Sequence, residues 1–137
     1  MYLDTDVVLA ALKRDDWLKS SVDVRALDAP KTSAATCIEV QYAMQDRWER
    51  ERLTTTHEAI ADEGIELVPL RTEHVAAGGE LRRSHDRLNL FDAIHLGTAR
   101  ALGEPIVSTD TLYPSPRAVR SRLMLCGSSS CIDPWRA

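Results

Sequence analysis

The stretch Met1-Tyr2-Leu3-Asp4, a short apolar run that ends at an acidic residue, has a counterpart in Ile106-Val107-Ser108-Thr109-Asp110 near the other end of the chain. Each run has the length and composition of a short buried strand. In open α/β sheets, ligands bind at the carboxyl ends of the strands. Both runs therefore place an aspartate, Asp4 or Asp110, where a ligand site is expected.

Short strands alternate with helical segments along the chain. The apolar periodicity predicts helices over about 7–12, 15–27, 34–53, 54–63, 72–85 and 90–102. Gly64 and Gly103 follow two of these segments, as expected at helix ends. The predicted strands cover 2–3, 31–33, 65–68 and 105–108. The alternation predicts an α/β fold whose parallel sheet is covered by helices on both faces.

Length and composition indicate a globular domain. The chain has 137 residues, of which 44% are hydrophobic, and it contains no apolar run of the length that a transmembrane helix needs. Its N-terminus lacks the basic and apolar regions of a signal peptide. Three cysteines without CxxC spacing argue against a disulfide framework and a structural zinc site. We therefore expect a cytoplasmic protein without a membrane partner.

Two further acids lie early in predicted helices: Glu39 in the helix over 34–53 and Asp92 in the helix over 90–102. Converging carboxylates repel one another unless they are protonated or bridged by a hard cation, and Mg²⁺ or Mn²⁺ takes oxygen ligands. A bound divalent ion can activate water for attack on a phosphodiester. Each acid alone also has a structural explanation as a turn or helix residue. Together with Asp4 and Asp110, however, they predict a metal-dependent nuclease.

Four segments around these acids resemble the acidic motifs of the PIN-domain nucleases, in the family's order. They are Leu3-Asp4-Thr5-Asp6, Cys37-Ile38-Glu39-Val40, Phe91-Asp92-Ala93-Ile94-His95-Leu96-Gly97-Thr98-Ala99 and Val107-Ser108-Thr109-Asp110. The resemblance covers roughly Met1 to Tyr113. It implies a PIN-like three-layer α/β/α domain with a short, mostly parallel central sheet. The implied catalytic and metal-binding acids are Asp4, Glu39, Asp92 and Asp110, with Asp6 and Ser108 as supporting polar residues.

Small single-domain members of this kind resemble VapC-type toxins. The resemblance implies a Mg²⁺- or Mn²⁺-dependent endoribonuclease that hydrolyses RNA and is the toxin of a type II toxin–antitoxin pair. It also implies an antitoxin partner and a homodimer. The net charge of −4 would ordinarily argue against a nucleic-acid partner, but a metal centre with an arginine rim reconciles the two. Arg82, Arg83 and Arg87 are candidates for RNA contacts, and a solvated helix end explains them equally well.

The composition changes after Tyr113, where proline and serine cluster and no acid occurs before Asp133. PIN domains often carry another acid after the fourth motif and end with a further strand. We therefore predict a PIN-like nuclease domain over 1–113 and an irregular basic C-terminal segment over 114–137. This segment either completes the edge of the domain or forms a loose tail.

Two other functions are alternatives to the nuclease, and the first of them is disfavoured. The segment Asp4-Thr5-Asp6-Val7 also resembles the first motif of haloacid-dehalogenase-like phosphatases, in which the first aspartate is a nucleophile. That family also requires a later lysine, and the chain has none beyond Lys31. The second alternative is a catalytically inactive PIN-like module that binds RNA or protein. A nuclease requires the metal for turnover, whereas a binding module should tolerate the loss of Asp92.

His95 lies three positions after Asp92 on the same face of the predicted helix. This spacing allows it to order a water molecule or contact a substrate near the acids. The alternative is a packed or partly exposed helix histidine. The sequence favours this alternative.

Overall fold

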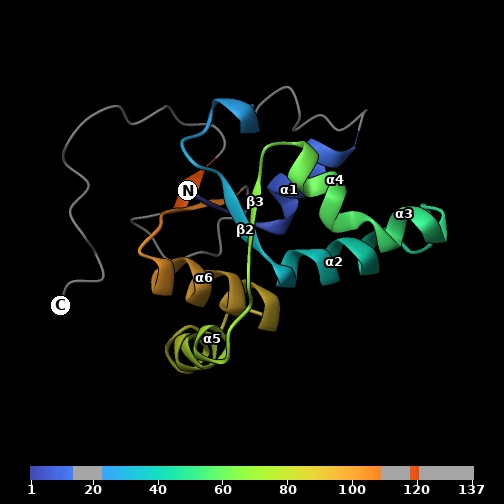
Figure 1. Cartoon of the computed structure of the whole chain (residues 1–137). Coiled ribbons are helices and arrows are strands. Elements are labelled where there is room, and N and C mark those ends of the chain that lie inside the picture. Colours follow the sequence, from blue (N-terminus) through green and yellow to red (C-terminus); the bar gives the residue numbers. More distant parts are fainter. Residues whose placement is uncertain (14–22, 109–117, 121–137) are drawn as a thin grey trace.

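The computed structural model describes residues 1–13, 23–108 and 118–120, the last three by their backbone alone (Figure 1). A helix is predicted over 15–27. Its residues 15–22 lie outside the described residues, and a 3-10 helix, η2 (Val24–Ala26), lies near the end of the predicted range. Asp110, one of the four predicted acids, also lies outside the described residues. None of the described helices is long and apolar enough to cross a membrane.

The strands form one parallel sheet in the order β3-β2-β1-β4-β5. They are β1 (Tyr2–Leu3), β2 (Lys31–Ser33), β3 (Glu66–Val68), β4 (Ile106–Ser108) and β5 (Ala118–Arg120). The helices are α1 (Thr5–Leu12), α2 (Ala34–Met44), α3 (Arg50–Thr54), α4 (Thr56–Asp62), α5 (Thr72–Ser84) and α6 (Leu90–Leu102). The predicted α/β fold with a parallel sheet is confirmed. β5 falls within the segment over 114–137, and the division of the chain at 113 stays a prediction.

Alternation along the strands produces three layers, because successive strand residues point to opposite faces of a sheet. Leu3 and Val107 pack with residues of α1, α2 and α4, including Val7, Val8, Val40 and Ile60. Tyr2 and Ile106 pack on the other face with residues of α5, α6 and the segment between them, including Leu81, Leu88, Ala93, Leu96 and Ala99. Figure 1 shows α5 and α6 on the opposite side of the sheet from α1 and α4. The predicted three-layer architecture is therefore confirmed.

The single long helix predicted over 34–53 is wrong. α2 ends at Met44, whose carbonyl accepts hydrogen bonds from the backbone N–H groups of Arg47 and Trp48, both at 2.9 Å. The backbone of Glu49 is then non-helical, and α3 begins at the next residue. Trp48 packs against the hydrophobic cluster on the face of the sheet that α1, α2 and α4 cover. The Arg52 guanidinium lies 3.8 Å from the centroid of its ring. Packing of this tryptophan overrides the helical pattern, because tertiary contacts outweigh local propensity.

Two glycines let α5 and α6 cross in direct backbone contact. A Cβ atom on Gly97 of α6 would lie 2.6 Å from the Gly78 nitrogen of α5 and 2.8 Å from the His74 carbonyl oxygen. A Cβ atom on Gly78 would lie 2.8 Å from the Ala93 carbonyl oxygen. The absence of side chains at this crossing fixes the position of α6, which carries Asp92 and His95.

The strand order reverses at β1. The chain moves from β1 to β2 and β3 on one side, and then continues in β4 and β5 on the other. Ligands of open α/β sheets bind beside the carboxyl ends of the strands at such a switch point. Asp4 and Ser108 lie at the carboxyl ends of β1 and β4, so the topology places both residues there.

Candidate active site

Asp4 joins the end of β1 to the beginning of α1. Its backbone N–H donates to the Val107 carbonyl oxygen at 3.0 Å, which extends the pairing with β4. Its side chain caps α1 by accepting a hydrogen bond from the Thr5 N–H at 2.6 Å. The other carboxylate oxygen accepts from the Ser108 hydroxyl at 2.7 Å. Both oxygens are therefore oriented, although the side chain belongs to a residue that is only 5% exposed.

Burial raises the pKa of Asp4 above its ordinary value. The nearby His95 ring and the Ser108 hydrogen bond lower this pKa, while the charge of Asp6 raises it further. Desolvation disfavours the charged form of a carboxyl group, and a nearby cation favours it. A buried aspartate with a raised pKa is thus a group whose ionised form a metal ion would stabilise.

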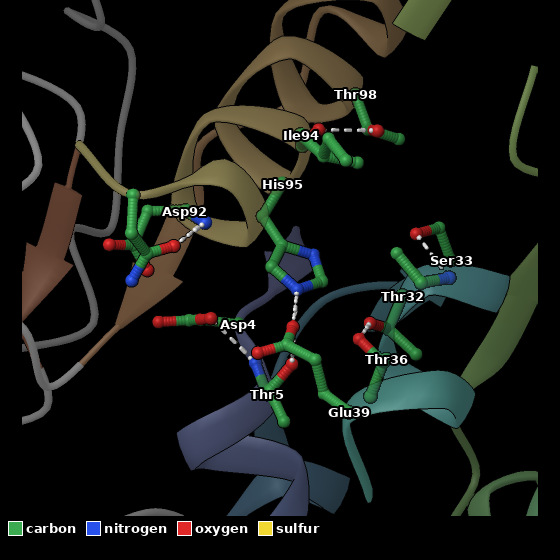
Figure 2. Close-up of polar contacts among 12 residues, drawn as sticks. Asp4, Thr5, Thr32, Ser33, Thr36, Glu39, Asp92, Ile94, His95 and Thr98 are labelled. Atoms are coloured by element: carbon green, nitrogen blue, oxygen red, sulfur yellow. Dashed lines mark hydrogen bonds and ion pairs between the residues drawn. The ribbon is translucent and has the colours of Figure 1, made fainter. Parts of the chain in front are cut away.

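Glu39 lies in the second turn of α2 and contacts both α1 and α6. The Thr5 hydroxyl donates to its Oε1 atom at 2.7 Å. The Nε2–H group of His95 donates to the same oxygen (Figure 2). Thr5 therefore contacts Asp4 through its backbone and Glu39 through its side chain, which brings these two predicted acids together.

Asp92 lies in the first turn of α6. The Asn89 side chain caps this helix by accepting a hydrogen bond from the Asp92 N–H at 2.9 Å. The carboxylate is half-buried and its Oδ2 atom is buried. A negative charge is favoured at this end of a helix because the unpaired N–H groups and the helix dipole are positive there. Figure 2 shows Asp92 on α6 in one view with Asp4, which leaves β1, and Glu39, which leaves α2.

The carboxylate oxygens of Asp4, Glu39 and Asp92 are suitable ligand atoms for a hard cation, because Mg²⁺ and Mn²⁺ prefer oxygen ligands. Within residues 1–13 and 23–108, however, no three His, Cys, Asp or Glu side chains are grouped so that they could hold a metal ion. Asp4 and Glu39 are linked through Thr5, and Asp110 lies outside the described residues. A complete ligand set would have to include a group beyond those described.

His95 is buried in the centre of the site with an exposed fraction of 0%. Its Nδ1 atom lies 2.7 Å from the Tyr2 hydroxyl, which donates to the Ser33 hydroxyl at 2.9 Å. Burial raises the pKa of Tyr2 to about 12, so the phenol stays protonated at neutral pH. The sequence placed His95 on the same face as Asp92, and the structure shows that the histidine is packed in the interior. Its contact with Glu39 was missed, because no sequence signal links the two residues.

The family model for the PIN domain matches residues 1–115 of the chain. The protein belongs to the PIN-domain family. The resemblance seen in the four acidic motifs is therefore confirmed, and the first motif is part of a PIN domain rather than of a phosphatase. Comparison with curated proteins found no match to the chain.

Three solved structures share the fold of this PIN domain. A toxin–antitoxin complex from Klebsiella pneumoniae aligns at 18% identity with a TM-score of 0.67, covering 88% of this chain and 96% of that chain. VapBC2 from Rickettsia felis, bound to a DNA fragment from its promoter, aligns at 16% identity and a TM-score of 0.59, covering 80% and 86%. FitAcB from Neisseria gonorrhoeae aligns at 19% identity and a TM-score of 0.55, covering 80% and 87%. At these identities the likeness concerns the fold.

The remaining predicted residues of the PIN domain lie at its surface or beside Asp4. Asp6 is exposed in the first turn of α1, while Ser108 is buried. Arg82 and Arg83 are exposed in the last turn of α5, and Arg87 is exposed between α5 and α6. Arg83 forms an ion pair with Glu80 at 3.2 Å. For Arg83, this contact favours the interpretation as part of a solvated helix end over that as an RNA contact.

Proposed function

We propose that this PIN domain is a metal-dependent endoribonuclease that uses Asp4, Glu39, Asp92 and Asp110 as its catalytic and metal-binding acids. The observation that carries the proposal is the junction of Asp4 and Glu39 through Thr5 at the carboxyl edge of the sheet. Asp92 lies in the first turn of α6, and Figure 2 shows it in the same view as Asp4 and Glu39. PIN domains are generally nucleases, and this edge is where ligands bind in open α/β sheets.

A bound Mg²⁺ or Mn²⁺ would supply an activated water and neutralise charge on the leaving oxygen. The protein's own contribution is to orient the carboxylate groups of Asp4 and Glu39. Asp4 is held by Thr5 and Ser108, and Glu39 is held by Thr5 and His95. Such prior orientation lowers the reorganisation that the reaction requires.

The proposal extends to a biological setting. We propose that the protein is the VapC-type toxin of a type II pair, with RNA as its substrate, a cognate antitoxin as its partner, a homodimeric state and a cytoplasmic location. Two of the similar structures support this, since one is described as a toxin–antitoxin complex and another as VapBC2. Arg82, Arg83 and Arg87 are the proposed RNA contacts.

Cleavage of a pool of structured RNAs tests the activity. The protein is assayed with Mg²⁺ or Mn²⁺, with EDTA, and as the Asp92→Asn variant, with Asp86→Asn as a matched control. Asp86 is an exposed acid in the turn before α6, so its substitution leaves the proposed site intact. The proposal requires metal-dependent cleavage that Asp92→Asn abolishes and Asp86→Asn retains. Equal activity of both variants would show that contaminating nuclease or another site cleaves the RNA.

The second candidate is a catalytically inactive PIN-like module that binds RNA or protein. It is favoured by the lack of a three-ligand group among the described residues. This candidate predicts a folded protein that binds RNA or an antitoxin with equal affinity before and after Asp92→Asn substitution. The same protein would cleave no RNA with either metal.

A further inference from the structure

His95 is connected through both of its ring nitrogens although it is completely buried. Nδ1 lies 2.7 Å from the Tyr2 hydroxyl, and Nε2 contacts Glu39 Oε1 and lies 3.0 Å from the Thr5 hydroxyl. Buried polar groups of folded proteins almost always have partners, and a ring held at both ends has one orientation. The ring therefore serves as a fixed link between β1 and Glu39.

This link joins the partly exposed Glu39 to the rigid core of the domain. The Tyr2 ring is packed on the α6 face of the sheet, with its centroid 5.7 Å from that of His95. The Tyr2 hydroxyl donates in turn to Ser33, the residue that caps α2. Glu39 itself is 25% exposed, and a glutamate at a surface ordinarily samples several rotamers. The contact with His95 restricts this freedom.

Two donors converge on one oxygen of Glu39. The Thr5 hydroxyl and His95 Nε2–H both donate to Oε1, from α1 and α6 respectively. Because a carboxylate is planar, two hydrogen bonds that reach Oε1 from different directions restrict the direction of Oε2. A histidine that only filled space would not need to meet Oε1 at the position where Thr5 also donates.

We infer that His95 is a positioning residue that, with Thr5, holds the Glu39 carboxylate in the orientation required beside Asp4. The inference rests on the proposed function, in which Glu39 is one of the catalytic acids. His95 acts through Glu39 and contacts no reacting atom. Partners of metal-binding side chains are typically worth about 10- to 100-fold in activity or metal affinity.

Two substitutions of His95 separate positioning from packing. His95→Gln places an amide nitrogen near the position of Nε2, so that it can still donate to Glu39. His95→Asn places its amide near the position of Nδ1 and loses Glu39. Both variants replace a buried ring by a smaller side chain, so both should lower the melting temperature, and His95→Asn, which lacks one more methylene, should lower it further. Thr5→Ser, which keeps the hydroxyl, and Thr5→Val, which removes it at nearly constant volume, form a second pair.

Kinetics of RNA cleavage and crystal structures of the metal-free variants give two independent measurements. We expect His95→Asn and Thr5→Val to lower kcat about 10- to 100-fold with little change in KM, while His95→Gln and Thr5→Ser stay within about threefold of the wild type. In the metal-free crystals, Glu39 should leave its position in His95→Asn and keep it in His95→Gln.

The two measurements also separate this inference from the proposed function. If Glu39 stays in place in His95→Asn, or if both His95 variants lose activity equally in proportion to stability, His95 only packs and the inference is overturned. If the wild-type protein cleaves no RNA, the proposed function has failed. The position of Glu39 in the variant crystals then still decides whether His95 orients it.

Discussion

The Ser108 hydroxyl donates a 2.7 Å hydrogen bond to Asp4 across 104 residues of sequence. The contact joins the carboxyl ends of β4 and β1, the two strands that flank the point where the strand order reverses. It lies inside the core, since Ser108 is fully buried. This single bond makes the orientation of Asp4 depend on the pairing of two distant strands.

Ser108→Ala should destabilise the protein by about 1–3 kcal/mol, because it removes a partner from a buried carboxylate. It should also raise the pKa of Asp4 further, since the Ser108 hydrogen bond lowers that pKa. Urea unfolding at neutral pH measures the first effect. Ser84→Ala, at an exposed position near the end of α5, is the control and should leave the midpoint nearly unchanged. Equal midpoints for both variants would contradict the role given to the Ser108 bond.

Gly97→Ala should destabilise the protein by about 1–3 kcal/mol, as expected for overpacking. The new methyl group would lie 2.6 Å from the Gly78 nitrogen, and helix backbone cannot yield as a side chain does. Gly79→Ala is the matched control, because a Cβ atom there meets nothing within 4 Å. In the middle of α5 it should be neutral or stabilising by up to about 1 kcal/mol. Thermal unfolding of the two variants gives the comparison.

Glu104 should stabilise the folded protein more at a pH above 4.5, the ordinary pKa of a glutamate, than at a pH below it. Burial by itself raises the pKa of Glu104, but hydrogen bonds and charges from Lys31 and the terminal ammonium group outweigh it, so the pKa is lowered. A carboxyl group with a lowered pKa in the folded state stabilises the fold above its unfolded pKa, and this stability is lost as the pH falls through the folded pKa. Glu104→Gln should therefore cost about 1 kcal/mol at pH 7.

The pH dependence of unfolding checks this sign. The difference in the free energy of unfolding between the wild type and Glu104→Gln should shrink as the pH falls below 4.5. Glu80→Gln, which alters an exposed ion pair with Arg83, should show no measurable difference at any pH. A wild-type advantage that persists unchanged in acid would contradict a lowered pKa for Glu104.

Replacing Arg82 and Arg87 together by alanine should weaken RNA binding and reduce its salt dependence. Arg82 is exposed in the last turn of α5, and Arg87 is exposed in the segment that leads into α6, the helix that carries Asp92. Each lost phosphate contact should lower the slope of log K against log salt by about 0.7 for single-stranded RNA. Arg50→Ala, exposed on α3, is the control. An unchanged slope would assign Arg82 and Arg87 to a solvated helix end.

The elements with strong local signals were predicted closely. α6 spans Leu90–Leu102 as expected, because Asn89 caps its first turn and Gly103 ends it with a φ of 68°. β2 occupies the predicted Lys31–Ser33. Alternating strands and helices also indicated the parallel sheet. Signals of this kind act over a few residues, so one sequence is enough to recognise them.

The break after Met44 had no such signal. Neither proline nor glycine occurs between Met44 and Arg50, and the helical pattern continues through this segment. The chain leaves the helix because Trp48 packs against the core, and that packing exists only after the sheet and its helices have assembled. The predicted helix was therefore wrong for a tertiary reason.

The sequence by itself determined strands β1 to β4, the helices with clear local signals, and the family. Only the tertiary structure decided which residues meet. Thr5 joins Asp4 to Glu39, His95 joins Tyr2 to Glu39, and Ser108 joins β4 to Asp4. These contacts depend on the strand order and on the close crossing of α5 and α6, because residues far apart in sequence meet only when the whole chain is packed.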